Sequence, residues 1–238
     1  MSFKENGVLA GLPIAELVFR EIDDDIEFSI LKDEGETVKI GEKVAEISGR
    51  TRSILKGERL ALNFLQRLSG IATYTRRYVE EVEGTDAKIV DTRKTTPNLR
   101  ILEKYAVRVG GGTNHRMGLY DAVLIKDNHI RSAGGVKEAI KKVETGHMVK
   151  IEVEVESLDD IEEALKAGTD IIMLDNMEPS EMKKAVDIIE DSAIIEASGG
   201  IILENIREIA ETGVDVISVG ALTHQIRSID ISLDLTEQ

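Results

Sequence analysis

The residues best suited to chemistry in this sequence lie in one stretch, Asp91–His129, which is rich in cationic side chains. The side chains that can give a pocket several cationic donors are Arg93, Lys94, His115, Arg116 and Lys126. Arginine offers planar pairs of N–H donors that match carboxylate and phosphate groups. We therefore expect this stretch to form a basic pocket for a small ligand that carries more than one negative charge.

The distribution of charge supports a pocket of this kind. The whole chain has a net charge of -15, yet residues 51–130 sum to +5, while residues 1–50 sum to −6 and residues 131–238 to −14. An acidic protein is a poor general binder of nucleic acid, because neutralising a phosphate backbone requires a broad basic surface. A basic middle in an acidic chain can instead concentrate a compact anion.

Six short apolar runs follow one another from residue 86 onward, and each is expected to be a strand covered on both faces. They are Ala87–Val90, Ala122–Ile125, Val149–Val153, Ile171–Leu174, Ala193–Ile195 and Val216–Val219. Amphipathic, helix-like segments between them are Val136–Val143, Leu158–Ala167, Glu181–Ile189 and Leu203–Thr212. Ser157 and Pro179 are typical helix-start residues ahead of two of them. Such a repeat forms either an open doubly wound sheet or a barrel, and six strands are fewer than a closed barrel needs. A partly open barrel is plausible on this pattern.

Charged residues, hydroxyl residues or glycine follow each of the six runs. The residues at these ends are Asp91–Thr96, Lys126–His129, Glu154, Asp175–Asn176, Glu196–Gly200 and Gly220–His224. In a β/α barrel the loops after the strands meet at one mouth, where the chemistry takes place. We therefore interpret these residues as the rim of an active site.

Two acids, Glu154 and Asp175, stand at this otherwise basic rim. Their expected roles are to bind Mg²⁺, directly or through the substrate, or to bind sugar hydroxyls, because Mg²⁺ prefers carboxylate and phosphate oxygens. The alternative is that they pair internally with Lys126 or Lys94.

Two glycine-containing loops at the rim, Ser198–Gly200 and Gly220–Ala221, each precede a helical segment. Backbone N–H groups at such positions are the usual phosphate site of barrels. Arg100, Lys104 and Arg108 recur at helical spacing, and we interpret them as a partly solvated helix face rather than as ligand contacts.

Several classes of function are excluded. The chain has no Cys, which rules out disulfides and a Cys-based zinc site, and its rim histidines His115, His129 and His224 lack the spacing of a zinc hydrolase. It has no apolar run of about 18 residues, and its start is not that of a secretory signal. We expect a cytoplasmic enzyme with neither a nucleic-acid nor a membrane partner.

The N-terminal part follows a different pattern. Glu27–Leu31 alternates in hydrophobicity, and Gly35–Gly49 reads as short strands punctuated by glycine, so a small antiparallel sheet is expected. A long helix is predicted over Gly57–Val82, and because it is apolar on more than one side it should be largely buried.

Three segments together resemble the quinolinate phosphoribosyltransferase family, also called decarboxylating nicotinate-nucleotide pyrophosphorylase, of the type II phosphoribosyltransferases. They are Gly57–Thr73, Asp91–Arg100 and Gly110–His129. The similarity continues to Val219–His224 and so covers essentially the whole chain. Family members usually have further residues ahead of the segment that matches Gly7–Gly11.

The resemblance implies an α/β fold: a partly open (β/α) barrel with a smaller N-terminal α/β sandwich domain. We expect residues 1–85 to form the sandwich, residues 86–225 the catalytic barrel, and the tail 226–238 to pack back on the first domain. The resemblance also implies a homodimer with shared active sites, or a hexamer.

The family's site residues can be carried over by matching motif. Around the two quinolinate carboxylates the resemblance places Arg59 of the neighbouring subunit together with Arg93, His115, Arg116 and Lys126. For phosphoribosyl pyrophosphate and its Mg²⁺ it implies Lys94, Glu154, Asp175, Ser198, Gly199, Gly220 and His224. The catalytic members of this set are expected to be Lys94, Lys126, Glu154 and Asp175.

The implied reaction transfers the phosphoribosyl group to the pyridine nitrogen of quinolinate, releases pyrophosphate and CO₂, and gives nicotinate mononucleotide for NAD biosynthesis. Two alternatives remain open. One is a nicotinate phosphoribosyltransferase or related paralogue of the same fold, which would hold one carboxylate and should not need Arg93, Arg116 and Lys126 together. The other is a catalytically inactive binding or assembly protein, which would be expected to have lost some rim residues.

Overall fold

The computed structural model describes residues 1–144 and 148–235, which divide into two compact units. The first unit contains residues 1–77, 95–112 and the described residues from 221 onward, and the second contains residues 78–94 and 113–220. The sequence predicts that the chain passes between the two parts near residues 85 and 225, whereas it passes between the units at four points. The difference arises because helix α3 (Arg100–Val109), which follows the first barrel strand, packs on helix α2 (Thr51–Glu81) in the first unit.

The second unit is built on a six-stranded parallel sheet, as predicted. Its strands are β6 (Lys88–Val90), β7 (Val123–Ile125), β8 (Ile151–Val155), β9 (Ile171–Asp175), β10 (Ile194–Ser198) and β11 (Val216–Ser218). Their spatial order is β6-β11-β10-β9-β8-β7, so the first two strands in sequence form the two edges. This confirms a partly open barrel, with the opening between β6 and β7.

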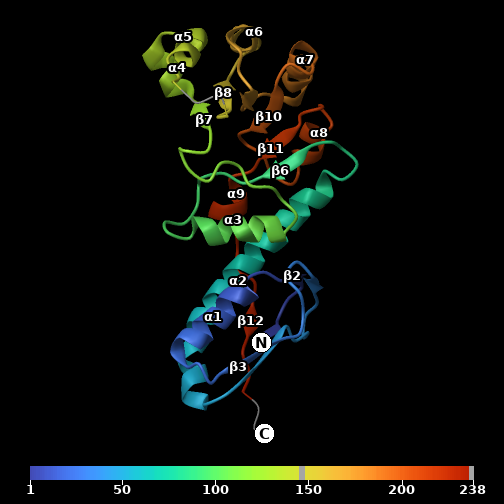
Figure 1. The fold of residues 1–238 in the computed structure, drawn as a ribbon. Helices are drawn as coiled ribbons and strands as arrows, with labels where there is room; N and C mark the ends of the chain where they lie inside the picture. The colour runs from blue at the N-terminus through green and yellow to red at the C-terminus, as the bar shows by residue number, and fades with distance from the viewer. Residues whose placement is uncertain (145–147, 236–238) are drawn as a thin grey trace. The chain divides into compact units, whose positions relative to one another are not determined.

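Helices follow the strands of this unit in the expected alternation (Figure 1). They are α4 (Asp127–Ala133), α5 (Val136–Lys141), α6 (Leu158–Ala167), α7 (Pro179–Ile189) and α8 (Ile206–Ala210). The predicted N-terminal signals are confirmed: Ser157 Oγ accepts the backbone N–H of Asp160, and Pro179 lies in the first turn of α7. Helix α8 is shorter than the predicted segment at both ends.

The first unit combines helices with pairs of very short antiparallel strands. The strand pairs are β1 (Ser2–Phe3) with β12 (Ile231–Ser232), β2 (Gly7–Val8) with β4 (Thr37–Val38), and β3 (Glu27–Ile30) with β5 (Ala45–Ser48). Its other helices are α1 (Leu12–Ile22) and α9 (Ala221–His224). The tail was expected to pack on this part of the chain; its strand β12 pairs with β1, and residues 236–238 lie outside the described residues.

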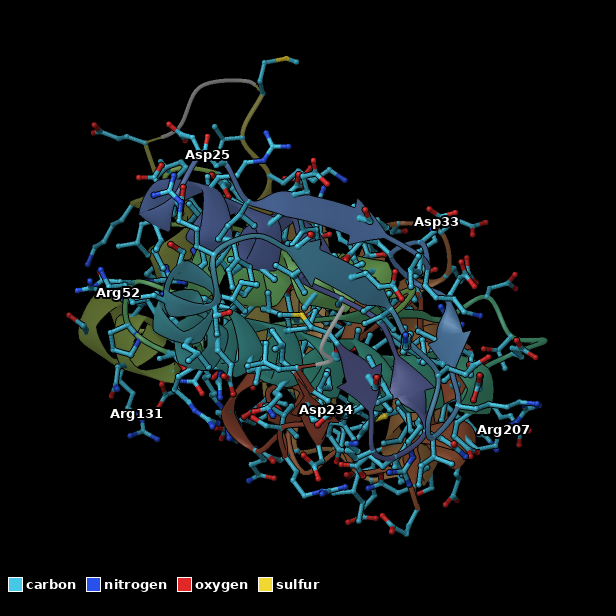
Figure 2. All side chains as sticks on the ribbon, turned by 90° about the horizontal axis from the view of Figure 1, so that it is seen from below. Asp25, Asp33, Arg52, Arg131, Arg207 and Asp234 are labelled. Carbon is cyan, nitrogen blue, oxygen red and sulfur yellow. The ribbon has the colours of Figure 1, made fainter. Side chains whose placement is uncertain are left out.

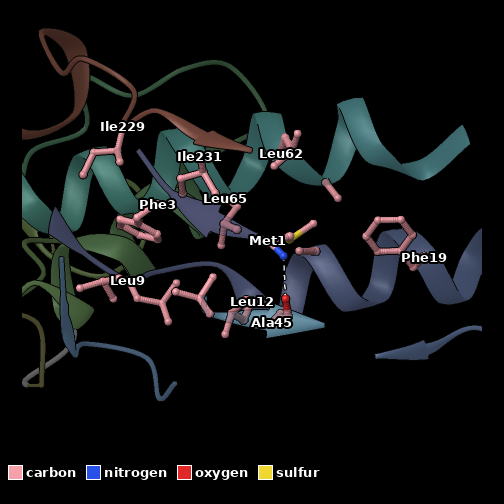
Figure 3. Packing of buried hydrophobic residues seen from close by; sticks show 14 of the residues in the cluster. Met1, Phe3, Leu9, Leu12, Phe19, Ala45, Leu62, Leu65, Ile229 and Ile231 are labelled. Carbon is pink, nitrogen blue, oxygen red and sulfur yellow. Dashed lines mark hydrogen bonds between the residues drawn. The ribbon is translucent and has the colours of Figure 1, made fainter. Parts of the chain in front are cut away.

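A buried hydrophobic cluster holds the first unit together (Figure 3). Phe3, Leu12, Phe19 and Leu65 are each at most 1% exposed, although they come from a strand and two different helices. Burying side chains of this size removes apolar surface from water, at roughly 25 cal/mol per Å². The six charged side chains that are labelled in Figure 2 are all exposed.

Among the described helices, none combines the length and the apolar character needed to cross a bilayer. The 31-residue helix α2 is long enough, but charged side chains occur along it.

Glycine at position 70 is required by a close approach of backbone to helix α2. A Cβ atom at Gly70 would lie 2.4 Å from the carbonyl oxygen of Arg227, in the segment that leads to β12. We expect Gly70→Ala to lower the free energy of unfolding by about 1–3 kcal/mol, because backbone must move to relieve the overlap. Chemical denaturation measures this. Lys56→Ala, at an exposed position of the same helix, is the control and should change stability by less than about 0.5 kcal/mol; equal losses in the two variants would contradict the explanation.

Candidate active site

A buried aspartate at the end of β6 fixes the start of the basic segment. Asp91 is 0% exposed, and its Oδ1 accepts the backbone N–H of His115 at 3.0 Å while Oδ2 accepts Nδ2 of Asn114 at 2.6 Å. Thr113 forms a bridge with Val90 of β6. The chain therefore returns to the barrel at residue 113, and the backbone of His115 is held beside the end of β6.

The ring of His115 connects two strands of the sheet. Its Nε2 lies 3.3 Å from Oε2 of Glu152 on β8 and 3.4 Å from Oε2 of Glu196 on β10. The two glutamate side chains are 1% and 3% exposed, and among the described residues Oε1 of Glu196 has no hydrogen-bond partner. The nitrogen and carboxylate oxygens lie within 4.8 Å of one another, a spacing that a metal ion also uses; a proton on Nε2 serves both carboxylates here.

The charges in this cluster act on one another. Burial lowers the pKa of His115, but the hydrogen bonds and charges of Glu152 and Glu196 outweigh it and raise the pKa to about 10. Burial also raises the pKa of Glu152. The other ring nitrogen, Nδ1, lies 2.8 Å from the backbone nitrogen of Arg116. It can accept that N–H only in the neutral ring, whereas the two carboxylates favour the protonated ring.

Two guanidinium groups lie beside this cluster. Arg116 donates from Nη1 to the carbonyl oxygen of Ala122 at 2.9 Å. Burial lowers the pKa of Arg116, and the positive charge of Arg93 lowers it further. Both arginines are half-buried. Two like charges that repel each other favour the binding of an anion, since the anion offsets the repulsion and can accept hydrogen bonds from guanidinium groups.

One part of the rim combines two acids with a lysine. It consists of Glu154, Asp175 and Lys126. Lys126 Nζ donates to Oε2 of Glu154 at 2.5 Å, and the Glu154 side chain is 9% exposed against 48% for Lys126. The internal pairing considered as an alternative for Glu154 is therefore present. Burial and the charge of Glu154 raise the pKa of Asp175, while the charge of Lys126 opposes the rise.

The glycine-containing loops are placed at the ends of β10 and β11. The first loop was expected to precede a helix, but residues 201–205 separate Ser198–Gly200 from α8. Gly220 directly precedes α9, which has only four residues. Helices this short have only a small dipole. The hydrogen-bond donors that these loops offer to a phosphate group are therefore the backbone N–H groups of the turns.

Several predicted residues lie outside this group. Lys94 is exposed just after the first barrel strand, and Arg59 is exposed on α2 in the first unit, as is His224 at the end of α9. Their roles at the site stay predictions. Lys104 was interpreted as part of a solvated helix face, and this is wrong, since it is 0% exposed on α3.

Glu152 was missed as a functional residue in the sequence, and Glu196 was placed at the rim without a role of its own. Their positions carry a signal nonetheless, because side chains two residues apart in a strand point to the same face. Glu152 lies two residues before Glu154 in β8, and Glu196 lies two residues before Ser198 in β10. An acid at such a position in an otherwise apolar strand points toward the barrel interior.

Comparisons with known proteins agree over almost the whole chain. The family model described as quinolinate phosphoribosyl transferase, N-terminal domain, matches residues 1–69, and the model for the C-terminal domain matches residues 71–234. A probable nicotinate-nucleotide pyrophosphorylase (carboxylating) of Bacillus subtilis is 48% identical over 235 residues, which is 98% of this chain and 81% of the relative.

Solved structures give the same result. NadC from Streptococcus pyogenes matches with a TM-score of 0.93 at 47% identity and covers 96% of this chain and 82% of its own. A nicotinate-nucleotide pyrophosphorylase from Ehrlichia chaffeensis matches with a TM-score of 0.94 at 43% identity, over 98% and 85%. Human nicotinic acid phosphoribosyltransferase is only 12% identical, with a TM-score of 0.64, and shares the fold alone.

Proposed function

Because the chain belongs to the quinolinate phosphoribosyltransferase family, we propose that it transfers phosphoribosyl from phosphoribosyl pyrophosphate to quinolinate. The products are nicotinate mononucleotide, pyrophosphate and CO₂, in de novo NAD biosynthesis. The observation that carries this proposal is the match to both domains of the family over residues 1–69 and 71–234. Two half-buried guanidinium groups, those of Arg93 and Arg116, agree with it. A dianion such as quinolinate can neutralise both of their charges, whereas a monocarboxylate neutralises one.

The residues then divide between the two substrates. Arg93 and Arg116 would bind the quinolinate carboxylates, and His115, whose backbone N–H donates to buried Asp91, would help to fix the segment that carries Arg116. Lys126 would stand between the two substrates, since it pairs with Glu154 of the acidic part of the rim. Lys94, Ser198, Gly199, Gly220 and His224 would hold phosphoribosyl pyrophosphate, as the family motifs predict.

Catalysis in this arrangement would depend on positioning and electrostatics. As the bond between ribose and pyrophosphate lengthens, positive charge develops on the ribose, and the carboxylates of Glu154 and Asp175 are suited to stabilise it. After transfer, the ring nitrogen carries positive charge and stabilises the electron pair left when the 2-carboxylate departs as CO₂. No acid–base residue is strictly required for that second step.

Magnesium fits the acidic side of the rim. Mg²⁺ is commonly bound by one or two carboxylates together with substrate phosphates. Burial and the charge of Glu154 raise the pKa of Asp175, and a cation would relieve this repulsion. Glu154 and Asp175 would hold Mg²⁺, directly or through the substrate, and the metal would neutralise charge on the departing pyrophosphate.

A second subunit is part of the proposal. Arg59 is exposed on α2, and the neighbouring Leu60 is 51% exposed, which suits a helix face that meets another copy. We propose a homodimer in which Arg59 completes the neighbour's site, with a hexamer as the alternative, and a cytoplasmic location.

One assay tests this function against its rivals. The protein is incubated with phosphoribosyl pyrophosphate, Mg²⁺ and quinolinate labelled in its 2-carboxylate, and released CO₂ is measured. Turnover of nicotinate without turnover of quinolinate would select the nicotinate enzyme. No turnover by correctly assembled protein would favour a binding or assembly role.

Replacing Arg116 by alanine tests the dicarboxylate side. We expect quinolinate to bind roughly 10- to 100-fold more weakly, because a hydrogen-bonded charge pair contributes about 1.5–3 kcal/mol. The KM for phosphoribosyl pyrophosphate should change little. Calorimetric titration with quinolinate measures the effect, and unchanged quinolinate affinity would remove Arg116 from the pocket.

A further inference from the structure

The residue after Asp175 has an unusual backbone conformation. Asn176 has a φ of 54°, and among the described residues only Asn98 and Glu190 are other non-glycine residues with positive φ. Asparagine tolerates this left-handed region better than most residues, but at a cost relative to glycine. Surrounding contacts must therefore stabilise the conformation at this point of the rim.

Those contacts join the ends of two neighbouring strands. The backbone N–H of Asn176 donates to the carbonyl oxygen of Ser198 at 2.9 Å, immediately beyond the last paired residues of β9 and β10, Asp175 and Ser198. The side-chain Nδ2 of Asn176 donates to Oδ2 of Asp175 at 2.8 Å. One residue thus holds an acid at the end of β9 and the turn at the end of β10.

The Ser198–Gly200 turn packs closely against the side chain of Asn176. Gly199 has a φ of 88°, and a Cβ atom there would lie 2.2 Å from Oδ1 of Asn176 and 2.9 Å from its backbone nitrogen. Glycine at position 199 is therefore required both by its own conformation and by the asparagine side chain beside it.

We propose that Asn176 is a positioning residue that locks the carboxylate of Asp175 and the Ser198–Gly200 turn into one fixed arrangement, so that both address the same sugar-phosphate ligand. This inference rests on the proposed function. The amide occupies one carboxylate oxygen, which orients the other. Binding of phosphoribosyl pyrophosphate should depend on this arrangement, whereas binding of quinolinate alone should not.

Two substitutions distinguish the contribution of the Asn176 amide from that of its backbone conformation. Asn176→Gly adopts the left-handed conformation without strain and lacks the amide donor, while Asn176→Asp keeps the shape but replaces the donor by an oxygen. In both variants we expect the KM for phosphoribosyl pyrophosphate to rise about tenfold or more, since a hydrogen bond to a charged group is lost. Quinolinate affinity, measured by calorimetry without phosphoribosyl pyrophosphate, should stay within about twofold.

Glu190 offers a matched control. It has a φ of 47° in the turn after α7, at the end of the helix that leads away from the rim. Glu190→Gly places glycine at another residue with a positive φ. It should leave the KM values for phosphoribosyl pyrophosphate and quinolinate unchanged. If the wild-type enzyme turns over and Asn176→Gly has the same KM for phosphoribosyl pyrophosphate, the proposed role of Asn176 is overturned and the proposed function is not. A wild-type protein without turnover would overturn the proposed function as well.

A double-mutant cycle tests the contact itself. Gly199→Ala should weaken phosphoribosyl pyrophosphate binding in the wild-type background, and less so in the Asn176→Gly background, where the side chain that the new Cβ would overlap is gone. The recovery should be partial, because the backbone nitrogen and the positive φ remain. Equal losses in the two backgrounds would show that the two residues do not act together.

Discussion

Lys126→Met is expected to lower kcat roughly 100- to 1,000-fold, the effect of removing one charged donor from a preorganised site. Lys126 lies 2.5 Å from Glu154, and its charge opposes the rise in the pKa of Asp175. Without the ammonium group, this opposing charge is lost, and the repulsion between the carboxylates of Asp175 and Glu154 is no longer offset by it. The stabilisation of positive charge on the ribose would fall as the pKa of Asp175 rises further. Steady-state assays of CO₂ release measure the effect.

An exposed ion pair of the same type is the control. Lys166 pairs with Glu162 at 2.9 Å on α6, with 72% and 61% of the two side chains exposed. Such surface pairs contribute little, so Lys166→Met should retain wild-type kinetics and stability. Wild-type kcat in Lys126→Met would show that the lysine has no part in the reaction.

His115→Leu is expected to lower the free energy of unfolding by about 3–5 kcal/mol at neutral pH, the usual cost of leaving a buried charge without its partner. The ring is the shared partner of Glu152 and Glu196, which are 1% and 3% exposed. Leucine fills similar space but leaves these carboxylates without a donor. Chemical denaturation measures the loss, with His224→Leu as the control because His224 is exposed; similar stability of the two variants would contradict the role of the cluster.

The free energy of unfolding should fall as the pH rises, because folding raises the pKa of His115. The carboxylates outweigh burial and raise the pKa of His115 from 6.5 to about 10, so the folded protein retains a proton that the unfolded chain releases. The stabilisation is therefore complete below pH 6.5 and is lost as the pH rises toward 10. Nuclear magnetic resonance titration of the ring, with its signal assigned by its absence in His115→Leu, should show a midpoint far above 6.5. A midpoint at or below 6.5 would contradict the pairing.

Much of the fold could be predicted because it follows from local patterns. Continuous apolar runs identified all six barrel strands, and Ser157 and Pro179 marked two helix starts. The strand ends were informative for the same reason, since the ends of parallel strands lie together whatever the details of packing. This is why the pairing of Lys126 with Glu154, far apart in sequence, was already among the alternatives.

The parts that could not be predicted depend on contacts between segments. Glu152 looks like an isolated acid within an apolar strand, and only the register of the sheet brings it and Glu196 to His115. Asn176 was placed at the rim, but neither its positive φ nor its contact with Gly199 has a sequence signature of its own. Lys104 was misassigned since helical spacing of basic residues does not reveal which face packs inward.

The division of the chain into two interleaved units has a consequence at the level of the gene. The sequence passes from one unit to the other after Arg77, Lys94, Gly112 and Gly220, so no single cut in the coding region separates them. Residues 71–234 are the range matched by the C-terminal family model. A fragment of this range would contain α3 and β12 but would lack β1 and the part of α2 before residue 71, with which they make contacts. Recombination at one crossover point would therefore produce chimaeras with incomplete cores, and the two units should be inherited together.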